Sequence, residues 1–145
     1  MLPELSIFLS SKADGFNRAL EALVDAGVNI LTFSIDHVAP YHIVRIICSE
    51  PRKAYSQLLS RSLVFEANEV FGLRLPNRPG ALRAALDVLT KANVRVEYGY
   101  QTMLPGSDDA IVILKTSDED RAKAAFRAAG IDDIEDLAFA EAAGR

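Results

Sequence analysis

The apolar residues of the first half of the chain follow two alternating spacings. Short apolar runs typical of strands lie at Leu5–Leu9, Ile30–Ile35, Ile43–Cys48 and Leu63–Phe65. Between them, apolar residues recur at helical spacing, first at Phe16, Ala19, Leu20, Leu23 and Val24, then after Pro51 at Ala54, Tyr55, Leu58 and Leu59. The first half is therefore predicted to fold in the order strand, helix, strand, strand, helix, strand.

The second half repeats this pattern. Lys12–Ile30 aligns without gaps on Arg78–Val96, 66 positions later. Five apolar positions recur in this alignment, with Ala19, Leu20, Leu23, Ala26 and Val28 matched by Ala85, Leu86, Leu89, Ala92 and Val94. Downstream, Pro51–Ala54 aligns on Glu119–Ala122 at a shift of 68, so the second copy has two extra residues between its middle strands. Loops tolerate such insertions.

The repeat predicts the fold class and the domain boundaries. The second copy reads as strands at Val70–Leu75, Val94–Gln101, Ala110–Lys115 and Ile134–Ala138, with a helix after the first and third strands. The predicted fold is α+β, with two tandem ferredoxin-like βαββαβ units, each an antiparallel four-stranded sheet with two helices on one face. We expect the first unit at residues 1–68, the second at 69–139, and a short tail at 140–145.

Alternation along the second strand of each copy predicts which face is covered. In the second copy, Val94, Val96, Tyr98 and Tyr100 are expected to face the helices, with Arg95, Glu97, Gly99 and Gln101 on a solvated face. The first copy has Leu31, Phe33 and Ile35 at the polar positions. This row predicts an apolar patch on the helix-free face, and hence a homodimer or close contact between repeats. The alternative is that the strand kinks near Ser34 and both of its faces are core.

Charge and composition narrow the function. Lys and Arg number 16 against 20 Asp and Glu, which opposes nucleic-acid binding because that task needs clustered cations. No apolar run approaches the roughly 20 residues needed to cross a bilayer, and the start lacks a leader pattern, so we expect a cytoplasmic protein that does not insert into membranes. Cys48 is a single cysteine within an apolar run and is expected in the core.

No pattern of residues points to catalysis. The chain contains no nucleophile elbow and no phosphate-binding G-x-x-x-x-G-K-[ST] loop, so an enzyme is not expected. His37 and His42 flank a turn, but no further residues complete a metal-ligand set. Neither a metal nor another cofactor is expected.

Two short motifs indicate a family. The sequence Leu75–Leu82 closely resembles the loop between the first strand and first helix of ACT domains, where N-x-P-G-x-L is typical, and Ala92–Glu97 resembles the second ACT signature. With two βαββαβ units spanning nearly the whole chain, the sequence resembles the small, stand-alone bacterial tandem ACT proteins that carry no catalytic domain. This resemblance implies binding of a free amino acid at an interface between ACT units.

The resemblance also suggests which residues hold the ligand. Backbone amides of Gly80, Ala81 and Leu82 would receive its carboxylate at the positive end of the helix dipole. Gly80 would allow close approach of the ligand, and Pro79 fixes φ at the helix start. The expected contact residues in this copy are Asn77, Arg78, Pro79, Gly80, Ala81, Leu82 and Tyr98. An acceptor for the ammonium group is also required, and Asp36 on a neighbouring strand is the hypothesis.

The first copy departs from the motif. Its aligned loop, Ser10–Phe16, has Ala13 in place of proline and Asp14 in place of glycine. An aspartate there is expected to cap the helix with its own side chain and to repel a carboxylate. We therefore expect the second loop to hold the carboxylate, while Ser11 and Asp14 belong to a degenerate or altered site. The alternative is that neither loop binds a ligand and Pro79-Gly80 is only a tight turn.

The sequence thus predicts a non-enzymatic sensor or regulatory protein that binds a free amino acid and acts on a metabolic enzyme. The alternative function is a protein-interaction or dimerisation module without a small-molecule ligand. Asn77 and Gly80 favour ligand binding, whereas the row Leu31, Phe33 and Ile35 favours association.

Overall fold

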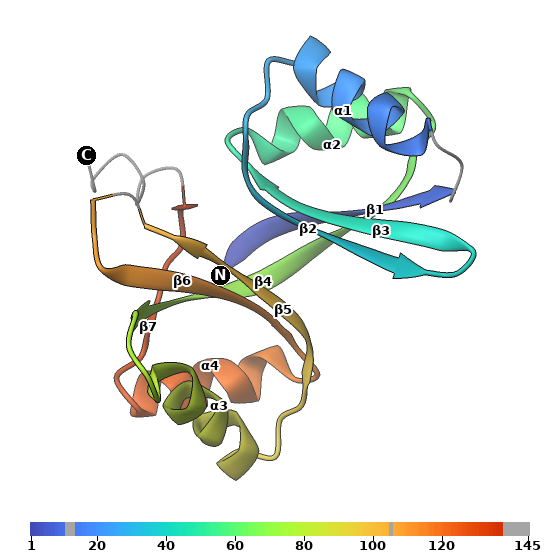
Figure 1. The fold of residues 1–145 in the computed structure, drawn as a ribbon. Helices are drawn as coiled ribbons and strands as arrows, with labels where there is room; N and C mark the ends of the chain where they lie inside the picture. Colours follow the sequence, from blue (N-terminus) through green and yellow to red (C-terminus); the bar gives the residue numbers. More distant parts are fainter. Residues whose placement is uncertain (11–13, 105, 138–145) are drawn as a thin grey trace. The chain divides into compact units, whose positions relative to one another are not determined.

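The computed structural model describes residues 1–10, 14–104 and 106–137. The chain divides into two compact units, one formed by Pro3–Glu69 and the other by Met1–Leu2 together with the chain from Val70 onward (Figure 1).

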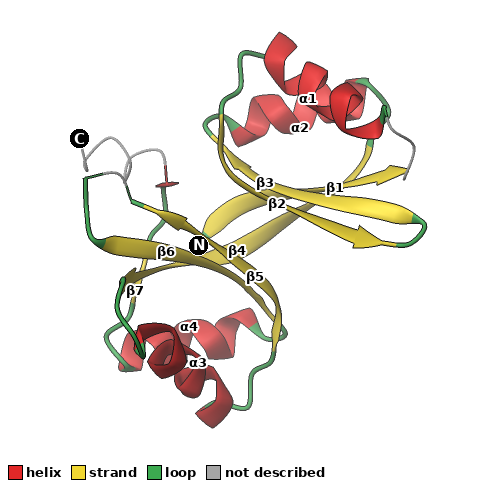
Figure 2. Ribbon diagram, in the orientation of Figure 1, coloured by secondary structure: helices red, strands yellow, loops and turns green. Residues whose placement is uncertain are grey.

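The first unit contains a four-stranded sheet with two helices on one face (Figure 2). Its elements are β1 (Leu2–Ser10), α1 (Gly15–Asp25), β2 (Ile30–Val38), β3 (Tyr41–Cys48), α2 (Pro51–Ser60) and the first part of β4 (Val64–Pro76). The strand order is β2-β3-β1-β4, and β3 is antiparallel to both β1 and β2. Apolar side chains fill the space between sheet and helices, among them Leu5, Ile7, Leu9, Ala19, Leu23, Val44, Ile46, Cys48 and Leu58.

The second unit has the same architecture. It consists of the later part of β4, then α3 (Ala81–Lys91), β5 (Val96–Met103), β6 (Asp109–Thr116), α4 (Glu119–Ala128) and β7 (Asp132–Asp133). The strand order is β5-β6-β4-β7, with antiparallel neighbours throughout. The core on the helix side includes Phe71, Leu73, Ala85, Leu89, Val112, Leu114, Ala122 and Phe126. Two ferredoxin-like βαββαβ units were predicted from the sequence, and the structure confirms them.

The element boundaries of the two units agree with the internal sequence repeat to the exact residue. Helix α1 begins at Gly15 and α3 begins at Ala81, 66 positions later, and both have 11 residues. Strand β3 and helix α2 correspond to β6 and α4 at a shift of 68, again with equal lengths. The extra two residues therefore lie between the middle strands, as the alignment indicates.

Two strand predictions need correction. Leu63–Phe65 and Val70–Leu75 were expected as separate strands, but β4 runs without a break from Val64 to Pro76. The closing strand was expected at Ile134–Ala138, of which Ala138 lies outside the described residues, and the structure places it at Asp132–Asp133. The Gly72 N–H donates to a side-chain oxygen of Asp133, and Ile134 N–H donates to the Gly72 carbonyl, which ends the regular ladder there.

The face assignment of the second copy was right for Val94, which lies in the helix-side core, but wrong for the residues after Val96. Directly opposed residues of an antiparallel pair share a face. Gly99 lies opposite Leu114 and therefore shares its helix side, whereas Tyr100 lies opposite Ile113 on the helix-free side. An irregularity in the β5–β6 register between Val96 and Tyr98 accounts for the change, because one extra residue exchanges the faces of all that follow.

The same correction applies to the first copy. Phe33 lies opposite Ile46 and Ile35 opposite Val44, so both side chains are on the helix side of the sheet. The register irregularity lies between Ile30 and Thr32, before Ser34. Phe33 and Ile35 are nevertheless 58% and 50% exposed, because β2 is the last strand of the sheet on this side. An exposed apolar pair exists, but at the outer edge of the sheet and not on the helix-free face.

Candidate ligand-binding loop

The loop that carries the ACT-like motif joins β4 to α3. Pro76 ends the strand and Ala81 begins the helix, and the four residues between them are exposed. Gly80 stands at the N-cap with φ +90° and ψ −15°, a left-handed conformation that glycine adopts at low cost. A Cβ atom on Gly80 would meet nothing within 4 Å. Backbone conformation, and not crowding by the protein, is thus the reason for glycine here.

Hydrogen bonds within the loop pair some, but not all, of the backbone amides at the start of α3. Arg78 N–H donates to the Pro76 carbonyl at 2.8 Å, and Ala81 N–H donates to the Arg78 carbonyl at 3.3 Å. The expectation that the Ala81 amide is free was therefore wrong. Among the described residues, none accepts a hydrogen bond from the amide of Gly80 or of Leu82. These two donors lie at the positive end of the α3 dipole.

A neighbouring turn anchors the loop. Asn77 N–H donates to the Asp108 carbonyl at 3.1 Å, and Arg74 Nε lies 2.7 Å from Asp109 Oδ2. The carboxylate of Asp109 is thus paired with a cation close to the loop. The sequence did not predict this ion pair, although Arg74 lies near the end of β4 and Asp109 begins β6, and these two strands pair with each other.

Tyr98 lies far from the loop within the same sheet. The β5–β6 register places Met103 opposite Ala110 at the loop end, and Tyr98 opposite Lys115. Tyr98 lies five residue steps along the strand from Met103, which corresponds to roughly 17 Å at the usual rise per residue. The structure therefore does not bring Tyr98 to Gly80. Met103, which is half exposed, is the β5 residue at the loop end of the sheet.

The proposed ammonium acceptor already has a cationic partner. Asp36 lies on β2 of the first unit, and its carboxylate forms an ion pair with the Arg45 guanidinium on β3. The carboxylate is about half exposed, whereas the Arg45 side chain is mostly buried. A ligand ammonium group at Asp36 would have to compete with Arg45.

The N-cap residue of the first copy differs from Gly80 in backbone conformation as well as in residue type. Ser11 lies outside the described residues. Asp14 is the exposed N-cap residue of α1, with φ −92° and ψ −7°, and its side chain makes no capping hydrogen bond. The prediction that Asp14 caps its own helix was wrong. Its carboxylate still places a negative charge at the start of α1.

Cys48 and the two histidines lie outside this loop. Burial raises the pKa of the Cys48 thiol, which lies in the core as predicted. The rings of His37 and His42 lie 4.8 Å apart, but the described residues contain no group of three or more metal-ligating side chains. In the described part of the chain, no helix is long and apolar enough to span a membrane.

Comparison with known proteins identifies the family. The chain belongs to the ACT domain pair family, whose model matches residues 1–142. Protein BT0572 from Bacteroides thetaiotaomicron has a similar structure, with a TM-score of 0.85, 29% identity, and coverage of 92% of this chain and 91% of that one. The ligand-free regulatory subunit of aspartate kinase from Thermus thermophilus shares the fold at 15% identity, with a TM-score of 0.58 and coverage of 88% and 90%. No curated protein sequence matches the chain.

Proposed function

We propose that this protein is a non-enzymatic regulatory protein that binds a free amino acid at the loop Asn77–Leu82, with a facing ACT unit completing the site. One observation carries the proposal. The left-handed N-cap at Gly80 begins α3 without a side-chain cap and leaves the Gly80 and Leu82 amides unpaired in the described structure. Amides of this kind at a helix start suit a carboxylate.

The surroundings of the loop fit an α-carboxylate. The space in front of Gly80 is open, so a ligand can approach its backbone. The nearby Asp109 carboxylate is paired with Arg74, which reduces its repulsion of an anion. Asn77 is exposed and offers both a donor and an acceptor to the polar groups of a ligand.

The two copies are proposed to differ in this role. Asp14 stands where the second copy has Gly80, and its negative charge disfavours a carboxylate at α1. The second loop is therefore the proposed carboxylate site, and a cytoplasmic homodimer acting on a metabolic enzyme is the proposed setting. Structural neighbours from Thermus thermophilus and Thermus flavus are regulatory subunits of aspartate kinase, which makes an enzyme partner a reasonable expectation for this chain too.

A second candidate function is protein association without a small ligand. Four large apolar side chains on the β2–β3 hairpin are at least half exposed, namely Phe33, Ile35, Val38 and Tyr41. Apolar patches of this kind often mark interaction sites. Self-association is compatible with amino-acid binding, and a ligand-binding measurement separates an amino-acid sensor from a module that only associates.

A thermal-shift screen tests the proposal. The purified protein is heated in the presence of each of the twenty common amino acids at about 10 mM, because a ligand that binds the native state raises the unfolding midpoint. A rise with one amino acid or a few related ones supports a sensor. If no amino acid changes the midpoint of the folded protein, the proposal fails and the association function becomes the better account.

A further inference from the structure

The two histidines of the chain, His37 and His42, form a pair across the β2–β3 hairpin. They lie directly opposite each other in the strand register, so both side chains are on the same face of the sheet. Phe33 and Ile35, at alternate positions before His37, lie on the helix side, and the histidine pair therefore does too. The Phe16 ring on α1 packs against His42 with centroids 5.1 Å apart, as expected for this face.

The two imidazole rings are spaced for a shared metal ion. Their centroids lie 4.8 Å apart, and their planes make an angle of 49°. An ion about 2.0–2.1 Å from one nitrogen of each ring, in near-tetrahedral geometry, would place the two centroids roughly 5 Å apart. His37 is exposed, so its ring can turn a nitrogen toward the ion. The pair can therefore act as a two-ligand chelate without movement of the backbone.

The polar groups of the described protein do not hold either histidine. Their side chains form no hydrogen bond or ion pair with any described residue, and the Nδ1 atom of His42 is buried without a partner. A neutral imidazole has one nitrogen with a free lone pair, so the pair offers two nitrogen ligands. Imidazole nitrogen suits Zn²⁺, Ni²⁺ and Cu²⁺, whereas Mg²⁺ and Ca²⁺ prefer oxygen.

The second unit shows that the fold does not require a histidine pair here. By the repeat alignment, His37 matches Met103 and His42 matches Ala110. The structure confirms the correspondence, because Met103 lies opposite Ala110 in the β5–β6 register. The two histidines are therefore particular to the first unit, which is also the unit whose loop departs from the ACT-like motif.

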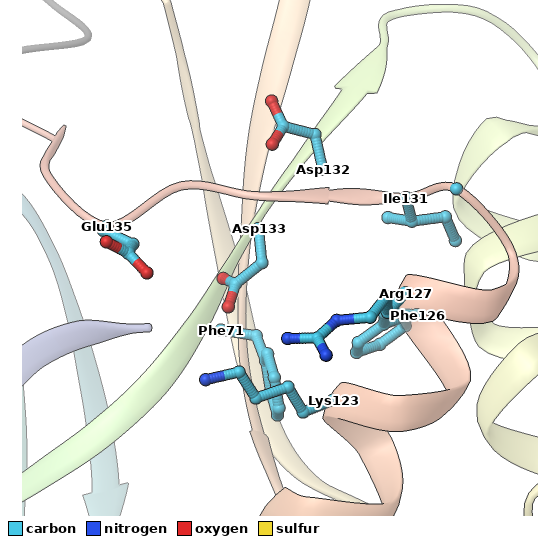
Figure 3. Close-up of a pocket in the computed structure, with 9 residues that line it drawn as sticks. Phe71, Lys123, Phe126, Arg127, Ile131, Asp132, Asp133 and Glu135 are labelled. Atoms are coloured by element: carbon cyan, nitrogen blue, oxygen red, sulfur yellow. The ribbon is translucent and has the colours of Figure 1, made fainter.

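Other acidic side chains do not form a comparable chelate. Asp132, Asp133 and Glu135 line a cavity beside α4, but the carboxylates of Asp132 and Asp133 point in opposite directions (Figure 3). The Asp133 carboxylate also accepts hydrogen bonds from the Gly72 amide and the Met1 ammonium group. In the described part of the chain, no three metal-ligating side chains are grouped to hold an ion. The histidine pair is thus the place at which to look for metal binding.

We propose that His37 and His42 form a binding site for a divalent transition-metal ion of the Zn²⁺, Ni²⁺ and Cu²⁺ class. Each histidine supplies one nitrogen, and water completes the coordination, because the described residues add no third ligand. The ion links the two strands at the end of the β2–β3 hairpin, where β2 is the outermost strand of the first unit. This inference does not depend on the proposed function of the Asn77–Leu82 loop.

Calorimetric titration of the whole chain, without a histidine tag, with NiCl₂ tests the site. We expect one Ni²⁺ ion per chain with a dissociation constant of roughly 100 µM, since the protein supplies only two ligands. Co²⁺ should bind more weakly than Ni²⁺, and Mg²⁺ should not bind. Absence of binding at about 1 mM Ni²⁺ would overturn the proposal. Equal binding of Mg²⁺ would also overturn it, because it would indicate oxygen ligands.

An NMR titration of the ¹⁵N-labelled chain locates the ion without any substitution. Ni²⁺ is paramagnetic and broadens the signals of nearby nuclei. At low Ni²⁺ concentration, the amide signals of residues 36–43 should broaden first. Broadening that begins elsewhere, for example at residues 132–135, would overturn the assignment to the hairpin.

Matched variants identify the ligands. His37→Gln and His42→Gln should each weaken Ni²⁺ binding at least ~10-fold, and His37→Met with His42→Ala, which copies the second unit, should abolish it. Cys48→Ala removes the single thiol, which is buried, and should leave binding unchanged. Unchanged binding in either histidine variant, or loss of binding in a folded Cys48→Ala variant, would overturn the proposal. Because the NMR titration uses the unmodified chain, it decides the question even if a variant does not fold.

Discussion

Gly99 lies directly opposite Leu114 in the β5–β6 pair, and a Cβ atom on Gly99 would stand 2.6 Å from the Leu114 Cδ2 atom. It would also stand 2.8 Å from the Ile113 carbonyl oxygen, which is backbone and cannot rotate away. The glycine is therefore required by close packing on the helix side of the sheet. The first copy has Phe33 at the matching position on β2, where its side chain is 58% exposed.

We predict that Gly99→Ala lowers the free energy of unfolding by about 1–3 kcal/mol, as overpacking does elsewhere. Urea denaturation followed by circular dichroism measures this change. Gln101→Ala serves as the control, because Gln101 lies two residues further along the same strand and is exposed. Its free energy of unfolding should stay within about 0.5 kcal/mol of that of the original protein. Equal stability of Gly99→Ala and Gln101→Ala would contradict the close packing described here.

Gly80→Asp, which copies the first loop, should abolish amino-acid binding at the Asn77–Leu82 loop. The new carboxylate repels that of the ligand, and the left-handed backbone at φ +90° adds a strain of about 1–2 kcal/mol for a residue with a Cβ. Calorimetric titration with the amino acid found by thermal shift measures binding. Gly80→Ala introduces the strain without the charge and should bind more tightly than Gly80→Asp. Unchanged affinity in Gly80→Asp would show that this loop does not hold the carboxylate.

Phe33→Glu should weaken self-association of the protein. Phe33 is 58% exposed on the outermost strand of the first unit, and a charge there opposes burial in an interface. Sedimentation velocity over a range of concentrations detects the change. Leu59→Glu alters a similarly exposed apolar residue on α2 and is the matched control. An identical sedimentation profile for Phe33→Glu and the original protein would remove the hairpin from consideration as an interface.

Cys48 should make the protein less stable at alkaline pH. Burial raises the pKa of its thiol in the folded state, so the unfolded chain loses the proton first as pH rises. The stabilisation is complete below the ordinary thiol pKa of about 8.5 and is lost as pH rises above it. Urea midpoints at pH 8 and pH 10 test this. In Cys48→Ala the midpoint should fall less between the two pH values, and an equal fall would contradict the prediction.

The fold could be predicted well from the sequence because the chain contains two copies of the same pattern of strands and helices. Two weak patterns that agree at a shift of 66 or 68 positions reinforce each other, and the helix boundaries follow this spacing to the residue. The closing strand of the second copy was misplaced because it is only two residues long, Asp132–Asp133, and is acidic instead of apolar. Its position depends on the bond between Asp133 and the Gly72 amide, which joins residues far apart in sequence.

The faces of the second strand in each copy could not be predicted from alternation alone. A single irregularity after Ile30 and another after Val96 reverse the faces of the residues that follow. Nothing in the local pattern marks these positions. The pairing partners on β3 and β6 determine the faces, and pairing is a tertiary property.

For the candidate site too, features contained in a contiguous motif could be predicted from the sequence, whereas features that depend on the folded backbone could not. The Asn77–Leu82 loop was found because its motif is contiguous and lies between a strand and a helix. The bond from the Ala81 amide to Arg78 and the distance of Tyr98 from the loop depend on backbone geometry.

The contrast between Gly80 and Asp14 also has a genetic consequence. A change of one base converts a glycine codon into an aspartate codon. Helix α1 forms with aspartate at its N-cap and has the same length as α3, so this change is compatible with the helix. After duplication of an ancestral unit, one of the two copies can therefore lose the proposed carboxylate site in a single mutational step while keeping its helix.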